Sequence, residues 1–294
     1  MRVTQSMLSN NMLRNLNNSY NKMGTLQEQI NSGKKITRPS QDPVVAIKGI
    51  GYRTDLGKVE QYQRNLGEVH NWLDSSDDAL DKVGLALQRV SELVIDAAND
   101  TKTPEDRLKI EKEIDQIRQQ VQDIGNTKVG DKYIFSGTKT LSPLHDGSYA
   151  TANANTSYNN AVNIEVYDGV EIKVNTNGIG LFDEIDTLMN DIQLKLKDDP
   201  TAVGTFDSFI SDISTNQNVL LGSRADIGAR QNRVEMMENR LGTQEVIVTK
   251  QLSNNEDIDY ERAISEMISQ ESVHRAALSV GARIIQPTLT DFLR

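Results

Sequence analysis

Residues 59–97 read VEQYQRNLGEVHNWLDSSDDALDKVGLALQRVSELVIDA, and this stretch decides the fold. Its apolar residues recur in alternating steps of three and four. That average period of about 3.5 residues keeps one seam of a helix facing a partner. A helix from about residue 45 to residue 98 would rise ~80 Å, which predicts a long rod packed lengthwise on other helices. The stepping positions are Val59, Tyr62, Leu66, Val69, Leu73, Ser76, Leu80, Val83, Leu87, Val90, Val94 and Ala97, with Ser76 the polar exception.

The composition favours elongated helices over a compact core. Only 37% of the 294 residues are hydrophobic, which suits helices with one apolar stripe and wet outer faces. The net charge of -10 argues against a nucleic-acid partner, and the absence of cysteine excludes disulfides and thiolate metal sites. No stretch approaches the ~20 apolar residues of a membrane helix. The start of the chain lacks the apolar block of a standard secretory signal, so we expect a cytoplasmic protein or export without a cleaved signal.

Both ends of the chain are predicted to form amphipathic helices. Residues 1–32 are rich in Asn, a poor helix former, so this helix needs a partner, and Gly33 can end it. A last helix is predicted from Tyr260 to about Ile285. The two helices could pair with each other or with other molecules. The stepping positions are Leu13, Leu16, Tyr20, Met23, Gln27 and Ile30 in the first helix, and Val273, Ala277, Val280 and Ile284 in the last.

Capping signals divide the helical part between these ends. Asp42-Pro43 is a good start for the long helix, and Thr103-Pro104-Glu105-Asp106 starts a second one that steps through Ile110–Ile124. The short connection predicts an antiparallel pair. Further helices are predicted over 182–197 and about 202–252, the latter with an interruption at Leu221-Gly222.

A small β-rich section interrupts the helices. Residues 133–135 favour a strand, and residues 138–161 resist assignment. Two alternating runs, 162–166 and 170–174, flank Asp168-Gly169, which predicts a hairpin.

Motifs of catalytic or metal sites are weak. Ser32 and Lys35 fit a Ser-x-x-Lys pattern without its companion motifs, and Glu271 and His274 fit half of a di-iron pattern that needs two copies. Nucleotide-binding and zinc-protease motifs are absent from the sequence. We therefore expect a protein that is not an enzyme and that needs no cofactor and no metal.

Three motifs in order carry a family resemblance. LQEQINSGKKI at 26–36 is followed by Asp42-Pro43, YIFSG at 133–137 follows the second helix, and GARQNR lies at 228–233. Together they resemble the bacterial flagellin superfamily over nearly the whole chain except about 138–180. The start, residues 1–5, and the end, residues 288–294, look more like the hook–filament junction proteins than like filament subunits.

The resemblance agrees with the residue patterns on the fold. We expect a mainly α protein, a long antiparallel coiled-coil helical rod with a small β-rich inserted outer domain and amphipathic terminal helices. The expected parts are an assembly core at 1–40 and 257–294, a rod at 41–137 and 181–256, and a β-rich outer domain at 138–180.

The resemblance also implies a function. It implies a structural adaptor that joins the flagellar hook to the filament, exported through the flagellar type III channel and therefore extracellular. The implied partners are hook-associated protein 1, flagellin, further copies of the chain in a ring, and an export chaperone over the C-terminal helix, with no nucleic acid and no membrane insertion. The terminal helices would be loosely held in the free subunit and fold on assembly. The implied assembly interface is Leu13, Leu16, Tyr20, Met23, Ile30, Val273, Ala277, Val280, Ile284, Phe292 and Leu293.

Three other functions stay open from the sequence. The chain could be flagellin itself, which would form long homopolymers. It could be a cytosolic coiled-coil scaffold, which would never be found in a sheared flagellar fraction. It could be a surface adhesin that binds through 138–180, in which case deleting that section would abolish adhesion.

Overall fold

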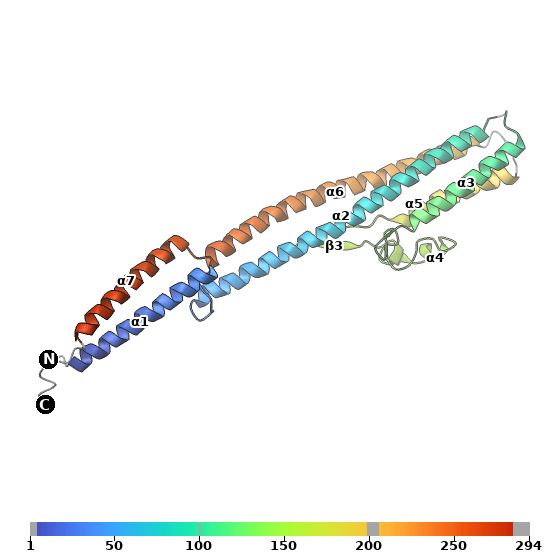
Figure 1. The fold of residues 1–294 in the computed structure, drawn as a ribbon. Coiled ribbons are helices and arrows are strands. Elements are labelled where there is room, and N and C mark those ends of the chain that lie inside the picture. Colours follow the sequence, from blue (N-terminus) through green and yellow to red (C-terminus); the bar gives the residue numbers. More distant parts are fainter. Residues whose placement is uncertain (1–4, 100, 199–205, 285–294) are drawn as a thin grey trace, which may run out of the picture. The chain divides into compact units, whose positions relative to one another are not determined.

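The protein is mainly α-helical, with two small antiparallel strand pairs. The computed structural model describes residues 5–99, 101–198 and 206–284 (Figure 1). None of the helices in these ranges has the length and apolarity needed to cross a membrane. The elements are α1 (Gln5–Ser32), α2 (Pro43–Ala97), α3 (Pro104–Gly125), β1 (Lys128–Val129), β2 (Lys132–Tyr133), α4 (Ala150–Asn153), the 3-10 helix η1 (Thr156–Tyr158), β3 (Asn163–Tyr167), β4 (Val170–Lys173), α5 (Gly178–Asp198), α6 (Phe206–Glu256) and α7 (Tyr260–Ile284).

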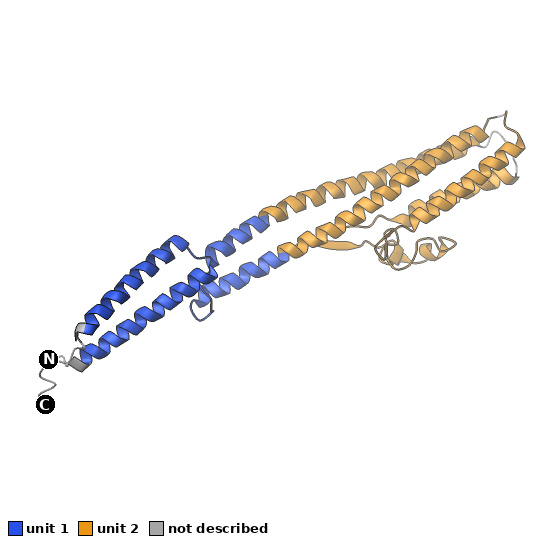
Figure 2. Ribbon diagram, viewed as in Figure 1, with its two compact units in different colours: residues 1–58, 244–294 blue, residues 59–243 orange. Residues whose placement is uncertain are grey.

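The chain forms two compact units (Figure 2). Unit 1 comprises residues 1–58 and 244–294, and unit 2 comprises residues 59–243. The long helices α2 and α6 contribute to both units. The expected division into core, rod and outer domain stays a prediction.

Helix α2 begins and packs as its sequence predicts. The Asp42 carboxylate accepts hydrogen bonds from the backbone N–H groups of Val44 and Val45 at 3.0 and 3.1 Å, which caps the first turn. The predicted seam from Val59 to Ala97 is buried, with Tyr62 half-buried. Ser76 fits into this seam because its hydroxyl donates to the Trp72 carbonyl oxygen at 2.7 Å, which leaves no unmet hydrogen bond donor there.

Helix α6 runs without a break, so the predicted interruption at Leu221-Gly222 is wrong. Gly222 is exposed and has open space around it, so its cost is the ~1 kcal/mol of a helical glycine. Burial on either side of it outweighs that cost. The buried apolar residues recur every seven positions, at Phe206, Ile213, Leu220, Ile227, Val234, Leu241 and Val248.

Helices α3 and α5 complete the helical part of unit 2. Thr103 caps α3 with Pro104 at its first position, as predicted. Arg89 of α2 contacts Glu113 of α3 at 2.7 Å, which places the two helices in the expected antiparallel order. The longer packing surface of α3 is against α5, also antiparallel, where the Phe182 ring covers Gly125.

The β-rich section lies within unit 2. Strands β3 and β4 form the predicted hairpin, with Ile164 opposite Ile172 and Gly169 in the turn at a positive φ of 72°. The YIFSG stretch starts in β2 and then turns inward, so that the Phe135 ring meets the Phe182 ring edge-on at 5.0 Å. Residues 138–161, which the sequence left unassigned, contain only α4, η1 and turns.

Candidate assembly surface on the terminal helices

The two terminal helices are tied together where one ends and the other begins. Gly33 ends α1 in the left-handed conformation, at φ 70°. Its carbonyl oxygen accepts a hydrogen bond from the N–H of Ile258 at 3.0 Å, and the N–H of Lys35 donates to the Glu256 carbonyl oxygen at 2.7 Å. Residues 33–35, the GKK of the LQEQINSGKKI motif, therefore form a short bridge to the residues that precede α7.

A cluster of charges strengthens this bridge. The nearly buried Glu256 carboxylate accepts from Arg53 at 2.6 Å and lies 3.5 Å from the Lys34 ammonium. Lys34 also donates to Asp257 at 2.7 Å; this hydrogen bond raises the pKa of Lys34 and lowers that of Asp257. Gly49 leaves room for Glu256, because a Cβ there would collide with its carboxylate.

Helices α1 and α7 pack side by side and antiparallel (Figure 1). The Met12 side chain lies over Gly281, the Tyr20 ring lies 6.2 Å from the His274 ring, and the Tyr260 hydroxyl lies against Gly33. These three contacts fix one register along the whole pair. In that register the facing seam positions are Met12, Leu16, Ser19, Met23, Leu26 and Ile30 on α1, and Gly281, Ala277, His274, Gln270, Met267 and Ala263 on α7.

The seam is less apolar than that of α2. The Ser19 hydroxyl and the His274 Nδ1 atom are buried without a hydrogen bond partner in the described residues. The register also places Ser19 opposite His274 and puts Gln270 in the seam. Buried polar atoms without partners cost free energy, so we expect this pair to be less stable than the packing along the apolar seam of α2.

The predicted interface residues occupy two kinds of position. Tyr20 is 64% exposed, and Leu13, Val273 and Val280 are also exposed. Leu16, Met23, Ile30 and Ala277 are half-buried in the seam. Ile284 is the last residue of α7, and Phe292 and Leu293 lie outside the described residues.

Three exposed apolar residues on α7 were not among the predicted interface residues. Ile264, Ile268 and Leu278 are 43%, 57% and 48% exposed. The predicted stripe of α7 begins at Val273, whereas the buried seam starts at Ala263 and leaves apolar residues on both of its sides. Plotting the whole of α7 on a helical wheel would have found them.

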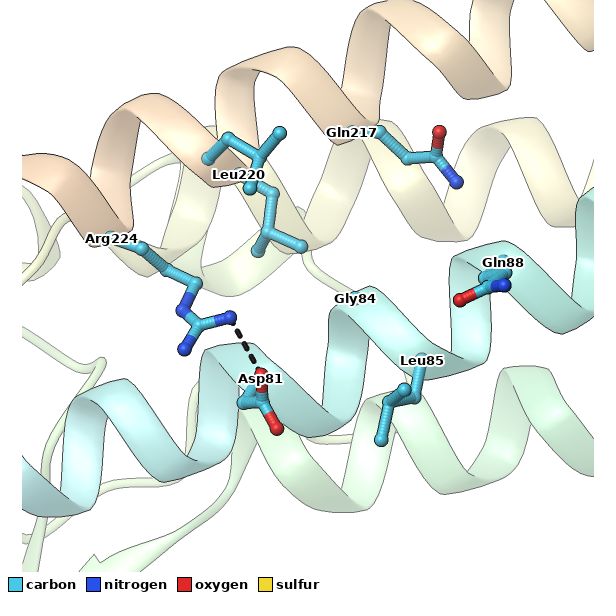
Figure 3. A pocket seen from close by; sticks show the side chains of 8 residues that line it. Asp81, Gly84, Leu85, Gln88, Gln217, Leu220 and Arg224 are labelled. Atoms are coloured by element: carbon cyan, nitrogen blue, oxygen red, sulfur yellow. Dashed lines mark hydrogen bonds and ion pairs between the residues drawn. The ribbon is translucent and has the colours of Figure 1, made fainter.

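Unit 2 contains an open groove between α2 and α6 (Figure 3). Its volume is about 390 Å³, and the exposed Leu85 and Leu221 line it. Arg224 crosses one end and donates to Asp81 at 2.6 Å. This ion pair fastens the two helices to each other.

A polar hollow of about 510 Å³ lies beside α3 and α5. Arg118 there donates to both oxygens of Asp186, at 2.8 and 3.0 Å, and Gln122 donates to the same carboxylate at 2.7 Å. Burial raises the pKa of Tyr149, whose hydroxyl is itself fully enclosed. Within the described ranges, no three His, Asp or Glu side chains are grouped as a metal ion would require. The arrangement stabilises α3 against α5.

The GARQNR stretch holds the hairpin against α6. The Arg230 guanidinium donates to the Asn175 carbonyl oxygen at 3.0 Å, just after β4. Gln231 donates to Asp74 of α2 at 2.9 Å. The motif therefore has a packing role in unit 2.

The chain matches two regions of one protein family. Residues 3–140 match the bacterial flagellin N-terminal helical region, and residues 210–293 match the bacterial flagellin C-terminal helical region. Flagellar hook-associated protein 3 of Escherichia coli K12 is 23% identical over 300 residues, covering 94% of this chain and 95% of that protein. Flagellin of Bacillus subtilis 168 is 26% identical over 299 residues, covering 97% of each.

A solved structure has the same fold. The flagellar hook-associated protein of Vibrio parahaemolyticus superposes with a TM-score of 0.62 at 23% identity, covering 74% of this chain and all of that one. The first matched region contains α1 and all of α2, and the second contains α7 and α6 from residue 210 onward. With its paired terminal helices and long antiparallel helices, the chain belongs to the bacterial flagellin superfamily.

Proposed function

We propose that the protein is the structural adaptor that joins the hook of the bacterial flagellum, through hook-associated protein 1, to the flagellin filament. The observation that carries this proposal is full-length similarity to hook-associated protein 3, together with terminal helices that leave large apolar side chains exposed. Components of this family are assembled in the flagellum, outside the cell.

The terminal pair is the proposed contact region with neighbouring subunits. Exposed side chains such as Tyr20 and Val280 lose contact with water when further copies of the chain pack against them, and this burial drives association. An export chaperone that covers α7 would shield the same side chains before assembly. Export through the flagellar type III channel is part of the proposal.

A structural role also accounts for the weak catalytic patterns. The Ser32 hydroxyl lies at the end of α1 and donates to the Gln29 carbonyl oxygen at 3.3 Å. Glu271 forms an ion pair with Arg275 of the next turn. Ser32 and Glu271 therefore each have a local structural partner, which supports a structural role for these two residues.

The proposal is tested by seeding. Purified protein is added to sheared hook–filament fragments and followed by electron microscopy. We expect a short cap that then permits flagellin to grow. Long new filaments of this protein alone would make it a flagellin, the alternative favoured by its similarity to flagellins along the whole chain. Absence of any assembly would contradict both.

A further inference from the structure

The α1–α7 pair has two different long sides. In an antiparallel pair, residues that directly follow the seam on one helix lie on the same side as residues that directly follow it on the other. An antiparallel pair has an approximate twofold axis perpendicular to the plane that contains both helices. Rotation about this axis exchanges the two helices and keeps each residue on the same side of that plane. Residues that directly precede the seam gather on the opposite side.

The first side is strongly apolar. Leu13 and Tyr20 directly follow the seam positions Met12 and Ser19 on α1. On α7 the exposed residues Ile264, Ile268 and Leu278 directly follow seam positions in the same way. We call this the tyrosine side, and its exposed large apolar residues are Leu13, Tyr20, Ile264, Ile268 and Leu278.

The second side has fewer apolar residues in a polar setting. Val273 and Val280 precede the seam positions His274 and Gly281, and Asn15 and Lys22 precede the seam on α1. We call this the valine side, and it consists of Asn15, Lys22, Val273 and Val280.

The register places the apolar residues of the two sides at the same heights. Because Met12 lies over Gly281, Leu13 is level with Val280. Because the Tyr20 ring contacts the His274 ring, Tyr20 is level with Val273. Two copies placed side by side in the same orientation would therefore bring Leu13 to Val280 and Tyr20 to Val273.

Lys22 is the charged residue of the valine side that has a carboxylate at its own height on the tyrosine side. Glu271 and Arg275 follow the seam on the same side as Tyr20 and form an ion pair with each other, and on the valine side Lys22 is exposed at the height of Glu271. Lys22 makes no ion pair within the part of the chain that the structure describes. In the neighbouring copy it would lie near the Tyr20 ring and the Glu271–Arg275 pair, where the ring and the carboxylate attract an ammonium group.

We propose that the tyrosine side of one copy docks on the valine side of the next copy. This inference rests on the proposed function, since subunits around a tube axis join through two different surfaces and such a contact repeats until the ring closes. It adds Ile264, Ile268 and Leu278 to the assembly contacts and assigns each predicted exposed residue to one of two complementary surfaces.

The inference is tested with cysteine pairs, which report cleanly because the chain contains no cysteine. Leu13→Cys/Val280→Cys and Tyr20→Cys/Val273→Cys are expressed in cells that lack the natural gene. Sheared flagella are oxidised and run on a non-reducing gel. We expect the monomer band to be lost to a ladder of cross-linked copies, because each chain carries one cysteine on each side. Each of the four single-cysteine variants should stay monomeric.

A matched control replaces the valine-side partner by its neighbour on the back of α7. Leu13→Cys/Ser279→Cys should incorporate and give no ladder. Dimers of Leu13→Cys or Tyr20→Cys alone would mean that two tyrosine sides meet, and would overturn the inference. Incorporated double variants without any cross-link would also overturn it. If the unmodified chain is missing from sheared flagella, the proposed function fails first, and that result is read before any oxidation.

Discussion

Two glycines with positive φ differ in the space that a side chain would have. Gly137 has φ 57° and Gly130 has φ 60°. A Cβ at Gly137 would lie 2.6 Å from the Tyr158 carbonyl carbon and 2.7 Å from the Ser157 carbonyl oxygen, whereas Gly130 has open space. The glycine of the YIFSG motif is therefore required by η1 packing on it as well as by its backbone conformation.

We expect Gly137→Ala to destabilise unit 2 more than Gly130→Ala does. Both substitutions carry the ~1–2 kcal/mol cost of a left-handed Ala. Only Gly137→Ala adds a collision with rigid backbone, worth a further ~1–3 kcal/mol. Urea denaturation followed by circular dichroism measures the difference in stability between the two variants. Equal midpoints would show that the η1 backbone moves aside to accommodate the Cβ.

The Arg118–Asp186 pair predicts a pH-dependent stability. Burial raises the pKa of Asp186, but hydrogen bonds from Arg118 and Gln122 outweigh it, so the pKa lies below its usual range. Such a carboxylate stabilises the fold above its unfolded pKa of about 3.9, and this stabilisation is lost as the pH falls through the folded pKa.

We expect Asp186→Asn to cost ~2–3 kcal/mol at pH 7, because it leaves the largely buried Arg118 without its counter-charge. The deficit should shrink as the pH falls below about 4, because Asp186 of the unfolded natural chain takes up a proton there and the folded carboxylate follows at lower pH. The matched control is Asp78→Asn, which removes a surface pair with Lys82 and should cost less than ~0.5 kcal/mol. Denaturation midpoints between pH 3 and pH 7 test this, and a deficit that does not change with pH would contradict it.

For the helices, the spacing of apolar residues predicted the structure best where one continuous apolar stripe is buried. The seam of α2 and the caps of α2 and α3 follow directly from the residues. In α6 only one apolar position per heptad is buried, so its regular spacing was obscured by exposed Val219, Leu221 and Met236. Gly222 then suggested a break that the continuous burial prevents.

The predicted assembly stripe of α7 can be tested with one charge. Val280→Asp should block incorporation into flagella, because a carboxylate would be desolvated when a neighbour covers it. It should leave α2 and α6 folded, since Val280 is exposed in the free chain. Motility and the content of sheared flagella are measured, with Ser279→Asp as the control on the back of the same helix. Normal incorporation of Val280→Asp would remove this residue from the interface.

The weak seam of the terminal pair predicts where proteases cut first. Trypsin should cleave the free subunit within residues 1–40 and 255–294, at sites such as Arg14 and Arg275, before it cuts the long helices. Short helices held by a seam with buried unpaired polar atoms open more often than α2 does. Mass spectrometry of brief digests identifies the first cuts, and first cuts at Lys82 or Arg89 would contradict the prediction.

At the scale of the whole molecule, order along the chain was easier to predict than contacts between distant segments. The succession of helices and the hairpin follow from caps, turn residues and periods. Residues 138–161 could not be assigned because turns and the packing of Tyr158 on Gly137, rather than a periodic pattern, hold them. The pairing of α1 with α7 was left open because each stripe alone fits a partner in the same chain or in another.

Immunogold electron microscopy of intact flagella tests whether the protein lies where the hook meets the filament. Antibody against residues 138–180 is applied to flagellated cells, with cells lacking the gene as the control. An adaptor between hook and filament should give one compact cluster of gold at that junction. Gold along the whole filament would mean that the protein is the filament subunit, and flagella without gold would contradict the assignment.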